Sequence, residues 1–261
     1  MMLFIETLQD SIINADTNLF LAINQMNHSF FDRFMSVYSG KWVWIPMYAS
    51  IFYVLLRNFN WKTVLGIVFG LTLTIVFADK VCAELIRPFF ERMRPSNLNN
   101  PLSSLVHVVD NYRGGSYGFP SCHAANTFGL TFFLFLLFRR YILTLFMLGW
   151  AVLTCYSRVY LGVHYPGDLF VGMLVGITGA TLMYFIFKRA SYYLKVNPQG
   201  AVYGGGKQSA SSEGIIAGGQ LSAGPQGYFH LPRLMHINAP ILIGAVTILG
   251  IIIYASLPWA F

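Results

Sequence analysis

Charged side chains are scarce in this sequence of 261 residues, where Asp, Glu, Lys and Arg together make up 10% of the total. A soluble domain usually carries about a quarter charged residues. Hydrophobic residues make up 56%, and the mean hydropathy is +0.57. The shortage of charge excludes an ordinary soluble protein and predicts a chain that crosses a membrane several times.

Cysteines are also few, and the spacing of Cys82, Cys122 and Cys155 fits neither a metal knuckle nor a disulfide framework. No Lys or Arg precedes Arg33, so we expect no cleavable signal peptide. Acidic residues are outnumbered by basic ones, which gives a net charge of +7. Because basic cytoplasmic loops account for such an excess in a membrane protein, no nucleic-acid partner is expected.

Hydrophobic runs divide the chain into four regions. Residues 1–38 are predicted to be an amphipathic helical region lying on the bilayer, or alternatively a helical cap on the soluble side. Residues 39–190 form the predicted transmembrane core, and residues 237–261 add a last transmembrane helix. The Gly- and Ser-rich stretch 191–236 is predicted to be a flexible cytoplasmic linker. The expected fold is an all-α polytopic membrane helix bundle with about six transmembrane helices, at roughly 42–57, 63–86, 123–138, 141–157, 168–187 and 239–257.

Positive charges gather in the loops after the first, third and fifth predicted transmembrane helices. These loops carry one acidic residue, Glu213, and nine basic ones: Arg57, Lys62, Arg139, Arg140, Lys188, Arg189, Lys195, Lys207 and Arg233. The positive-inside rule places them in the cytoplasm. We therefore expect a protein of the bacterial inner membrane whose loops 87–123 and 158–168 face the periplasm.

The stretch SRVYLGVHYPGD, from Ser157 to Asp168, places a cation, a histidine and a carboxylate near one helix end. Arg158 is a planar cation suited to a phosphate or a carboxylate. His164 and Asp168 are four positions apart, so at a helix start they share one face. The carboxylate can then accept the Nδ1 proton and leave Nε2 free as a nucleophile or base. A polar loop that merely faces water is the alternative.

A second stretch, FPSCHAANTF, lies where the third predicted transmembrane helix begins. A helix N-terminus offers unpaired N–H groups and a partial positive charge, which together favour an anion. Ser121 adds a hydroxyl donor, and His123 can give or take a proton. A capping serine beside an interfacial histidine is the simpler alternative.

A third stretch, IRPFFERMRPS, carries Arg87 and Arg94 seven positions apart. If the second transmembrane helix continues this far, two turns separate these arginines and both point to the same side. Two such guanidiniums repel each other unless an anion such as phosphate lies between them. A basic cluster that binds lipid headgroups is the alternative, and we assign Glu91 and Arg92 to it.

Together these stretches resemble the type 2 phosphatidic acid phosphatase family, the membrane branch of a superfamily that includes the vanadium haloperoxidases. The family motifs are K-x6-R-P, P-S-G-H and S-R-x5-H-x3-D. The third motif is complete here, and the second reads PSCH, with Cys122 in place of glycine. The resemblance covers roughly residues 40–187.

The first family motif has two matches in this sequence. KVCAELIRP fits it literally through Lys80 and Arg87, whereas RPFFERMRP fits through Arg87, in place of lysine, and Arg94. We prefer the second match, because a rise of about 1.5 Å per residue leaves Lys80 inside the hydrocarbon edge. Lys80 also has an ion-pair partner, Glu84, four residues later.

The resemblance implies a metal-independent phosphatase without a cofactor. His164 would attack phosphorus and form a phosphohistidine, Asp168 would hold the tautomer of His164, and His123 would protonate the leaving oxygen and then activate water. No metal is expected, since the one carboxylate firmly in the site is committed to His164. The phosphoryl oxygens would be held by Arg87, Arg94, Ser121, Arg158 and the backbone N–H groups near Cys122 and His123.

The implied substrate is a lipid phosphate or diphosphate whose tail stays in the bilayer. Candidates are undecaprenyl diphosphate, phosphatidylglycerol phosphate, phosphatidic acid and lipid A phosphates, and a periplasmic site favours the first or the last. A lipid phosphotransferase would use the same site. A membrane transporter is the non-enzymatic alternative, although it would not need both His123 and His164. Six transmembrane helices argue against a haloperoxidase, since those enzymes are soluble.

Overall fold

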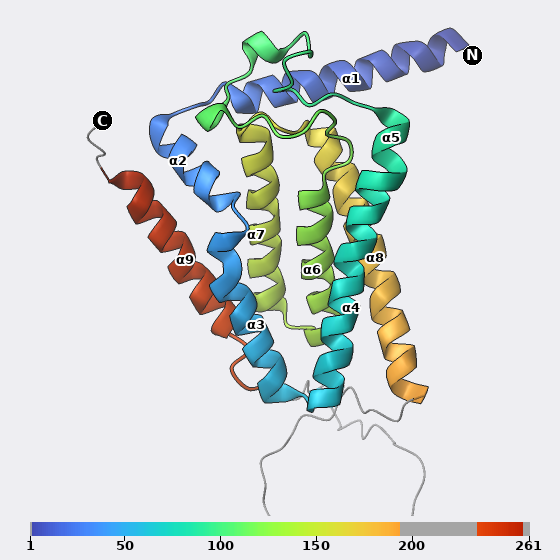
Figure 1. The fold of residues 1–261 in the computed structure, drawn as a ribbon, viewed down its shortest axis with the longest axis vertical. Coiled ribbons are helices and arrows are strands. Elements are labelled where there is room, and N and C mark those ends of the chain that lie inside the picture. The colour runs from blue at the N-terminus through green and yellow to red at the C-terminus, as the bar shows by residue number, and fades with distance from the viewer. Residues whose placement is uncertain (1, 194–233, 258–261) are drawn as a thin grey trace, which may run out of the picture.

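The computed structural model describes residues 2–193 and 234–257, and this part of the chain is helical with no named strand. The all-α prediction is therefore confirmed (Figure 1). Most of the predicted linker, residues 194–233, lies outside the described residues. The described α-helices of ten or more residues are α1 (Met2–Asn24), α2 (Ser29–Tyr38), α3 (Ile45–Asn58), α4 (Trp61–Lys80), α6 (Cys122–Phe138), α7 (Tyr141–Tyr160), α8 (Pro166–Tyr193) and α9 (Ala239–Ser256).

Local sequence sets several of these helix ends. The Asn60 side chain accepts a hydrogen bond from the amide of Thr63 and caps α4. Ser121 caps α6 in the same way through the amide of Ala124. Such caps satisfy donors that a helix leaves free in its first turn. At the other end of α6, Arg139 adopts a left-handed conformation with φ 51°, which separates α6 from α7.

The helix that begins with α4 continues through a π-helical turn, η2 (Val81–Ile86), and ends with α5 (Arg87–Phe90). Glu91 then adopts a left-handed conformation, with φ 44°. The prediction that Arg87 and Arg94 lie two turns apart on one helix is therefore wrong. Arg94 precedes a proline, a position that disfavours helical backbone, and it lies in the loop that follows.

Four described helices are long and apolar enough to cross a membrane: Trp61–Phe90, Tyr141–Tyr160, Pro166–Tyr192 and Ala239–Ser256. The apolar helix α6 has 17 residues, and α3 has 14. Both are shorter than the roughly 20 residues that a bilayer needs. Yet both lie in the bundle beside the long helices (Figure 1). Four of the six predicted transmembrane helices are therefore supported by their length and hydropathy, and α3 and α6 are supported by their position in the bundle.

Helix α6 packs most extensively against α8. Two glycines of α8 make this approach possible, since a Cβ at Gly172 would lie 2.3 Å from the carbonyl oxygen of Ser121. A Cβ at Gly176 would lie 2.1 Å from the carbonyl oxygen of Ala125. Small residues four positions apart let two helix backbones come together in a membrane. The N-termini of α6 and α8 are thereby held side by side.

Helix α1 lies across the end of the bundle where α6 and α8 begin (Figure 1). Phe20 is fully buried there, in a cluster with Val159, Tyr165 and Leu169. The loop between α5 and α6 covers the same end, and the buried side chain of Asn24 fastens it by accepting the amide of His107 at 2.8 Å. The end of the bundle that carries the sequence motifs is therefore closed over by α1 and this loop.

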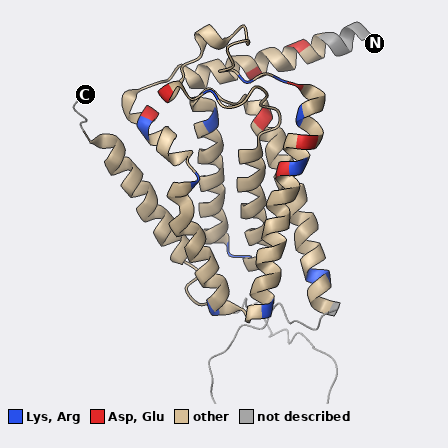
Figure 2. Ribbon diagram, viewed as in Figure 1, with Lys and Arg blue, Asp and Glu red and all other residues tan. Residues whose placement is uncertain are grey.

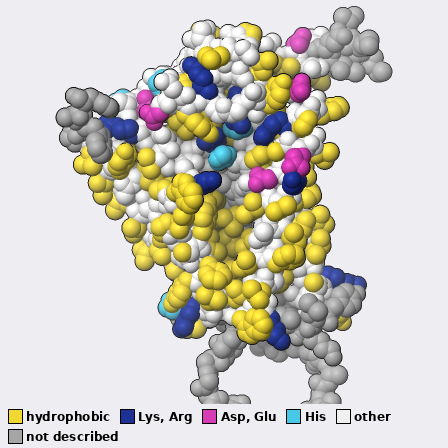
Figure 3. Space-filling view, viewed as in Figure 1, with side chains coloured by type: hydrophobic (Ala, Val, Ile, Leu, Met, Phe, Trp, Pro, Cys, Tyr) yellow, Lys and Arg dark blue, Asp and Glu magenta, His cyan; other side chains and the backbone are white. Residues whose placement is uncertain are grey.

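Charge differs between the two ends of the bundle, as Figure 2 shows. The acidic residues among the described residues lie toward the α1 end, whereas the opposite end shows only basic ones. On the face that Figure 3 shows, hydrophobic side chains make up much of the surface between the two ends. This pattern is that of a membrane-spanning bundle with one basic end, in line with the charge bias of the loops.

Candidate active site

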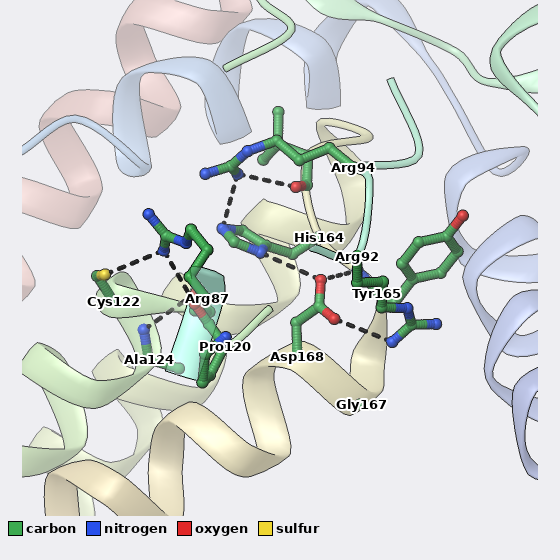
Figure 4. Close-up of polar contacts among 12 residues, drawn as sticks. Arg87, Arg92, Arg94, Pro120, Cys122, Ala124, His164, Tyr165, Gly167 and Asp168 are labelled. Atoms are coloured by element: carbon green, nitrogen blue, oxygen red, sulfur yellow. Dashed lines mark hydrogen bonds and ion pairs between the residues drawn. The ribbon is translucent and has the colours of Figure 1, made fainter. Parts of the chain in front are cut away.

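His164 lies in the short loop between α7 and α8, and Asp168 lies in the first turn of α8 (Figure 4). Nδ1 of His164 is 3.3 Å from Oδ2 of Asp168, and both residues are buried. Nε2 of His164 is 2.9 Å from Nη1 of Arg94. Because a guanidinium only donates, Nε2 must accept, and the neutral ring carries its proton on Nδ1. The ring therefore has the tautomer that leaves a lone pair on Nε2.

Three arginines surround this histidine. Burial lowers the pKa of His164 well below its usual value, and the positive charges of Arg94, Arg158 and Arg87 lower it further. Burial also lowers the pKa of Arg94 to about 10, and the charges of Arg158 and Arg87 add to that shift. These pKa shifts show that the three arginines lie close to one another and to His164. The lowered pKa keeps His164 neutral at physiological pH.

Each of the three arginines comes from a different element. Arg87, at the start of α5, donates to the carbonyl of Pro120 at 3.0 Å and to Sγ of Cys122 at 3.2 Å. Arg94, in the loop, donates to the carbonyl of Val163 at 2.9 Å. The third, Arg158, is buried on α7.

The hydrogen bonds of these arginines leave part of their donor capacity unused. Arg158 donates to Oγ of Ser39 at 2.6 Å and to the hydroxyl of Tyr112 at 3.3 Å. The Nε of Arg87, Arg94 and Arg158 is nevertheless buried in each case without a hydrogen-bond partner among the described residues. Three mutually repelling cations with spare donors suit an anion that has several oxygens.

The two matches of the first sequence motif are now distinguishable by position. Lys80 is exposed and forms the ion pair with Glu84 that its spacing predicts. Arg87 instead contacts Cys122, at the start of α6. The structure thus brings Arg87 and Arg94, and not Lys80, next to the other two motifs.

The second motif lies at the N-terminus of α6. Ser121 is buried, and its oxygen accepts the amide of Ala124 at 3.4 Å, so its hydroxyl proton is free to donate elsewhere. His123 is exposed and interacts electrostatically with Arg158, His164 and Arg94. The predicted proton donor and the predicted nucleophile therefore lie near each other.

The contacts of Arg92 differ from those that we predicted. It was expected to contact lipid headgroups, but Nη1 of Arg92 lies 2.9 Å from Oδ1 of Asp168, and its guanidinium lies 4.0 Å from the ring of Tyr165. Its other nitrogen, Nη2, lies 2.7 Å from Oδ2 of Asp16 on α1. The sequence gives no local signal for these contacts, because both carboxylate partners are 76 positions away from Arg92.

Gly118 is a second site residue that the sequence does not single out. A Cβ at this position would lie 3.1 Å from Oδ2 of Asp168, 3.1 Å from Cγ of Arg94 and 3.4 Å from Nδ1 of His164. The backbone of Gly118 is fixed by a hydrogen bond of 2.9 Å from its amide to the carbonyl of Arg92. Only a residue without a side chain packs here without displacing the His164–Asp168 pair.

A cavity of about 590 Å³ opens beside His123 and extends between α3, α4, α6 and α7. Its polar lining includes Ser39, Lys41, Asp79 and Asn126. Farther along the helices the lining is apolar, with Ile51, Leu55, Val68, Leu71 and Leu130. The cavity therefore joins a charged region at the α1 end to an apolar region inside the bundle.

Comparison with known proteins places these residues in a wider group. The sequence model described as "PAP2 superfamily" matches residues 62–192, which include all three motif stretches. A "Lipid A 4'-phosphatase" of Bacteroides thetaiotaomicron is 51% identical over 66% of this chain and 77% of that protein. A protein of the same name from Porphyromonas gingivalis is 33% identical over 67% of this chain and 74% of its own. An "Undecaprenyl-diphosphatase" of Sulfolobus acidocaldarius is 33% identical over 55% of this chain and 63% of that protein.

Proposed function

This chain belongs to the PAP2 superfamily and is a membrane lipid phosphatase, and from that premise we propose that it removes the 4'-phosphate of lipid A through a phosphohistidine at His164. The observation that carries the mechanism is the unprotonated Nε2 of His164, which lies among three arginines while Nδ1 faces Asp168. The relatives at 51% and 33% identity support the choice of substrate.

In the first step, Nε2 of His164 attacks phosphorus, and the bond from phosphorus to the sugar oxygen breaks. His123 gives its proton to that oxygen, so the leaving group departs as a neutral hydroxyl. The imidazole of His164 becomes positive as the bond forms, and the carboxylate of Asp168 stabilises this charge through Nδ1–H. Without Asp168 the attack would leave an uncompensated buried cation.

In the second step, His123 takes a proton from water, and the water oxygen attacks phosphorus. The bond from phosphorus to Nε2 breaks, inorganic phosphate leaves, and His164 returns to its neutral form. Phosphoryl transfer needs mainly positioning and stabilisation of negative charge, which Arg87, Arg94 and Arg158 supply together with the N-terminus of α6.

Arg94 has two roles in this scheme. In the structure its Nη1 donates a hydrogen bond to Nε2 of His164, the atom that attacks phosphorus. A bound phosphate offers three oxygens to the same guanidinium, so Arg94 transfers its hydrogen bond to the substrate as the substrate arrives. The lone pair of Nε2 is then free, which links attack to correct binding of the phosphate.

The cavity beside His123 supports a lipid substrate. A phosphate held by the arginines at the α1 end places the rest of the molecule next to the polar lining, where Lys41, Asp79 and Asn126 suit a sugar headgroup. The apolar part of the cavity, between α3 and α4, suits an acyl chain. The reaction is metal-independent in this proposal, because both oxygens of Asp168 already accept hydrogen bonds.

Mass spectrometry of lipid A incubated with the purified protein in mixed micelles tests this proposal. We expect loss of one phosphate, located by fragmentation to the 4' position, and unchanged turnover after treatment with EDTA. His164→Ala should abolish turnover, and His123→Ala should reduce it by about 10²–10⁴, the usual contribution of a general acid. His236→Asn, at the far end of the bundle, is the matched control and should behave like the wild type.

The outcome also separates the alternatives. Turnover of undecaprenyl diphosphate in preference to lipid A would replace the substrate assignment. The relative from Sulfolobus acidocaldarius, named "Undecaprenyl-diphosphatase", supports this alternative. Transfer of the phosphate to a second lipid instead of water would identify a phosphotransferase. Full activity of His164→Ala would contradict the phosphohistidine.

A further inference from the structure

We propose that Asp16, on the N-terminal helix α1, is a positioning residue for the His164–Asp168 pair and that it acts through Arg92. The inference rests on the function proposed above. Asp16 lies outside residues 62–192, the part of the chain that matches the family, whereas Arg92 and Asp168 lie inside it. A helix outside the matched region therefore supplies part of the charge arrangement around the nucleophile.

Arg92 is held between two carboxylates. Its Nη2 lies 2.7 Å from Oδ2 of Asp16, and its Nη1 lies 2.9 Å from Oδ1 of Asp168. The guanidinium also lies 4.0 Å from the ring of Tyr165, so its plane is supported from one side (Figure 4). The exposed fractions of the three side chains are 12% for Asp16, 27% for Arg92 and 1% for Asp168. The interaction is therefore more than a surface ion pair, which would contribute little.

Asp16 also fixes the backbone next to Asp168. Its second oxygen, Oδ1, accepts the amide of Gly167 at 2.7 Å, in the first turn of α8. Amides in the first turn of a helix have no partner within the helix, and a carboxylate there is favourable. A Cβ at Gly167 would lie 2.8 Å from Oδ2 of Asp16, so the carboxylate lies directly against this backbone. One side chain of α1 thus holds both Arg92 and the start of α8.

The charges of this group explain why a second carboxylate is needed. Arg92 by itself would neutralise Asp168, and the imidazole of His164 would then face a neutral pair. With Asp16 present, the three side chains carry a net charge of −1, which remains available for the positive charge that develops on His164 during attack. The charge matters because the site also contains Arg87, Arg94 and Arg158, all of which oppose a further cation.

This arrangement predicts a specific kinetic signature for Asp16→Asn. We expect kcat to fall at least tenfold while KM decreases, because loss of a negative charge strengthens the attraction of the site for a phosphate. Asp10→Asn is the matched control, since Asp10 is an exposed residue of the same helix. It should retain the kcat of the wild type. A defect that was only structural would reduce the active fraction of Asp16→Asn without a decrease in KM.

A double-mutant cycle tests whether Asp16 acts through Arg92. If it does, Asp16→Asn combined with Arg92→Gln should have the kcat of Arg92→Gln alone, within about twofold. Gly167→Ala is a second variant, which displaces the carboxylate of Asp16 without changing any charge. It should also lower kcat, and it keeps the proposal testable if Asp16→Asn fails to fold.

The possible failures are distinguishable. An active wild type together with a kcat of Asp16→Asn within twofold of it would overturn the inference, and so would fully additive effects in the double variant. If the wild type released no phosphate from any lipid, the proposed function would fail. Hydrogen exchange of the peptide around Gly167 would still decide the positioning role, since Asp16→Asn should speed it and Asp10→Asn should not. Unchanged exchange in Asp16→Asn would overturn the role independently of turnover.

Discussion

At the scale of single residues, the state of His164 depends on the cations around it. Its ring is buried and neutral, and Arg94 lies 2.9 Å from the nitrogen that attacks phosphorus. The nucleophile must be unprotonated, so activity is present above the pKa of His164 and is lost as the pH falls through that value. Because this pKa is lowered well below its usual value, the loss should occur below pH 6.5.

Arg94→Gln tests the electrostatic part of this argument. Removal of the nearest cation should raise the pKa of His164 toward its usual value, so the acidic limb of the kcat/KM profile should move to higher pH. The rate at the optimum should also fall, since one phosphate ligand is lost. Arg33→Gln, a cation that donates to the carbonyl of Leu257, is the control and should leave the limb in place. An unmoved limb in Arg94→Gln would contradict the assigned influence of Arg94.

Residue patterns in the sequence predict a side-chain contact correctly where both residues lie on one helix or at its ends. The spacing of His164 and Asp168 predicts their contact, and the spacing of Lys80 and Glu84 predicts theirs. The contacts of Arg92 were missed because they depend on how a loop folds back over α8. No short-range rule predicts such a path.

At the scale of helices, the site depends on the contact between α6 and α8. These helices contribute the second motif and Asp168, and the glycines of α8 let their backbones come close. A side chain at this contact would separate the two helix N-termini. The distance between the second motif and Asp168 therefore depends on the close packing of α6 against α8.

Gly176→Ala should destabilise the protein by about 1–3 kcal/mol, the usual cost of overpacking, and should lower kcat by separating the motifs. The matched control is Gly149→Ala on α7, where an added Cβ would meet nothing within 4 Å. That change should be neutral or slightly stabilising, since alanine is the better helix former. Thermal unfolding in detergent together with phosphate release measures both effects. Equal melting temperatures for the two variants would contradict the proposed role of the α6–α8 contact.

Hydrophobic runs located the six helices of the bundle, with ends that differ from the observed ones by up to about six residues. The expected range 123–138 compares with Cys122–Phe138, and 239–257 compares with Ala239–Ser256. The largest difference is at the end of the fifth transmembrane helix, which was expected at residue 187 and is observed at Tyr193. At the end of the second transmembrane helix, the polar residues after 86 were interpreted as a continuing helix. The left-handed backbone at Glu91 ends it at Phe90, and a non-glycine residue gives little warning of such a conformation.

At the scale of the whole molecule, the basic end and the site lie at opposite ends of the bundle (Figure 2). The positive-inside rule then places the site on the periplasmic side, where α1 would lie along the membrane surface. Leu8, Ile12 and Leu19 of α1 are exposed, so this helix offers apolar side chains to such a surface. Both statements remain predictions.

Cysteine labelling in intact cells tests the orientation. In a background without the three native cysteines, Asn99→Cys lies in the exposed loop at the α1 end, and Lys62→Cys lies in the exposed first turn of α4 at the opposite end. A membrane-impermeant maleimide should label Asn99→Cys in intact cells and Lys62→Cys only after the membrane is permeabilised. The reverse result would place His164 in the cytoplasm. The enzyme would then meet only lipids of the inner leaflet, and lipid A would be a substrate only before it crosses the membrane.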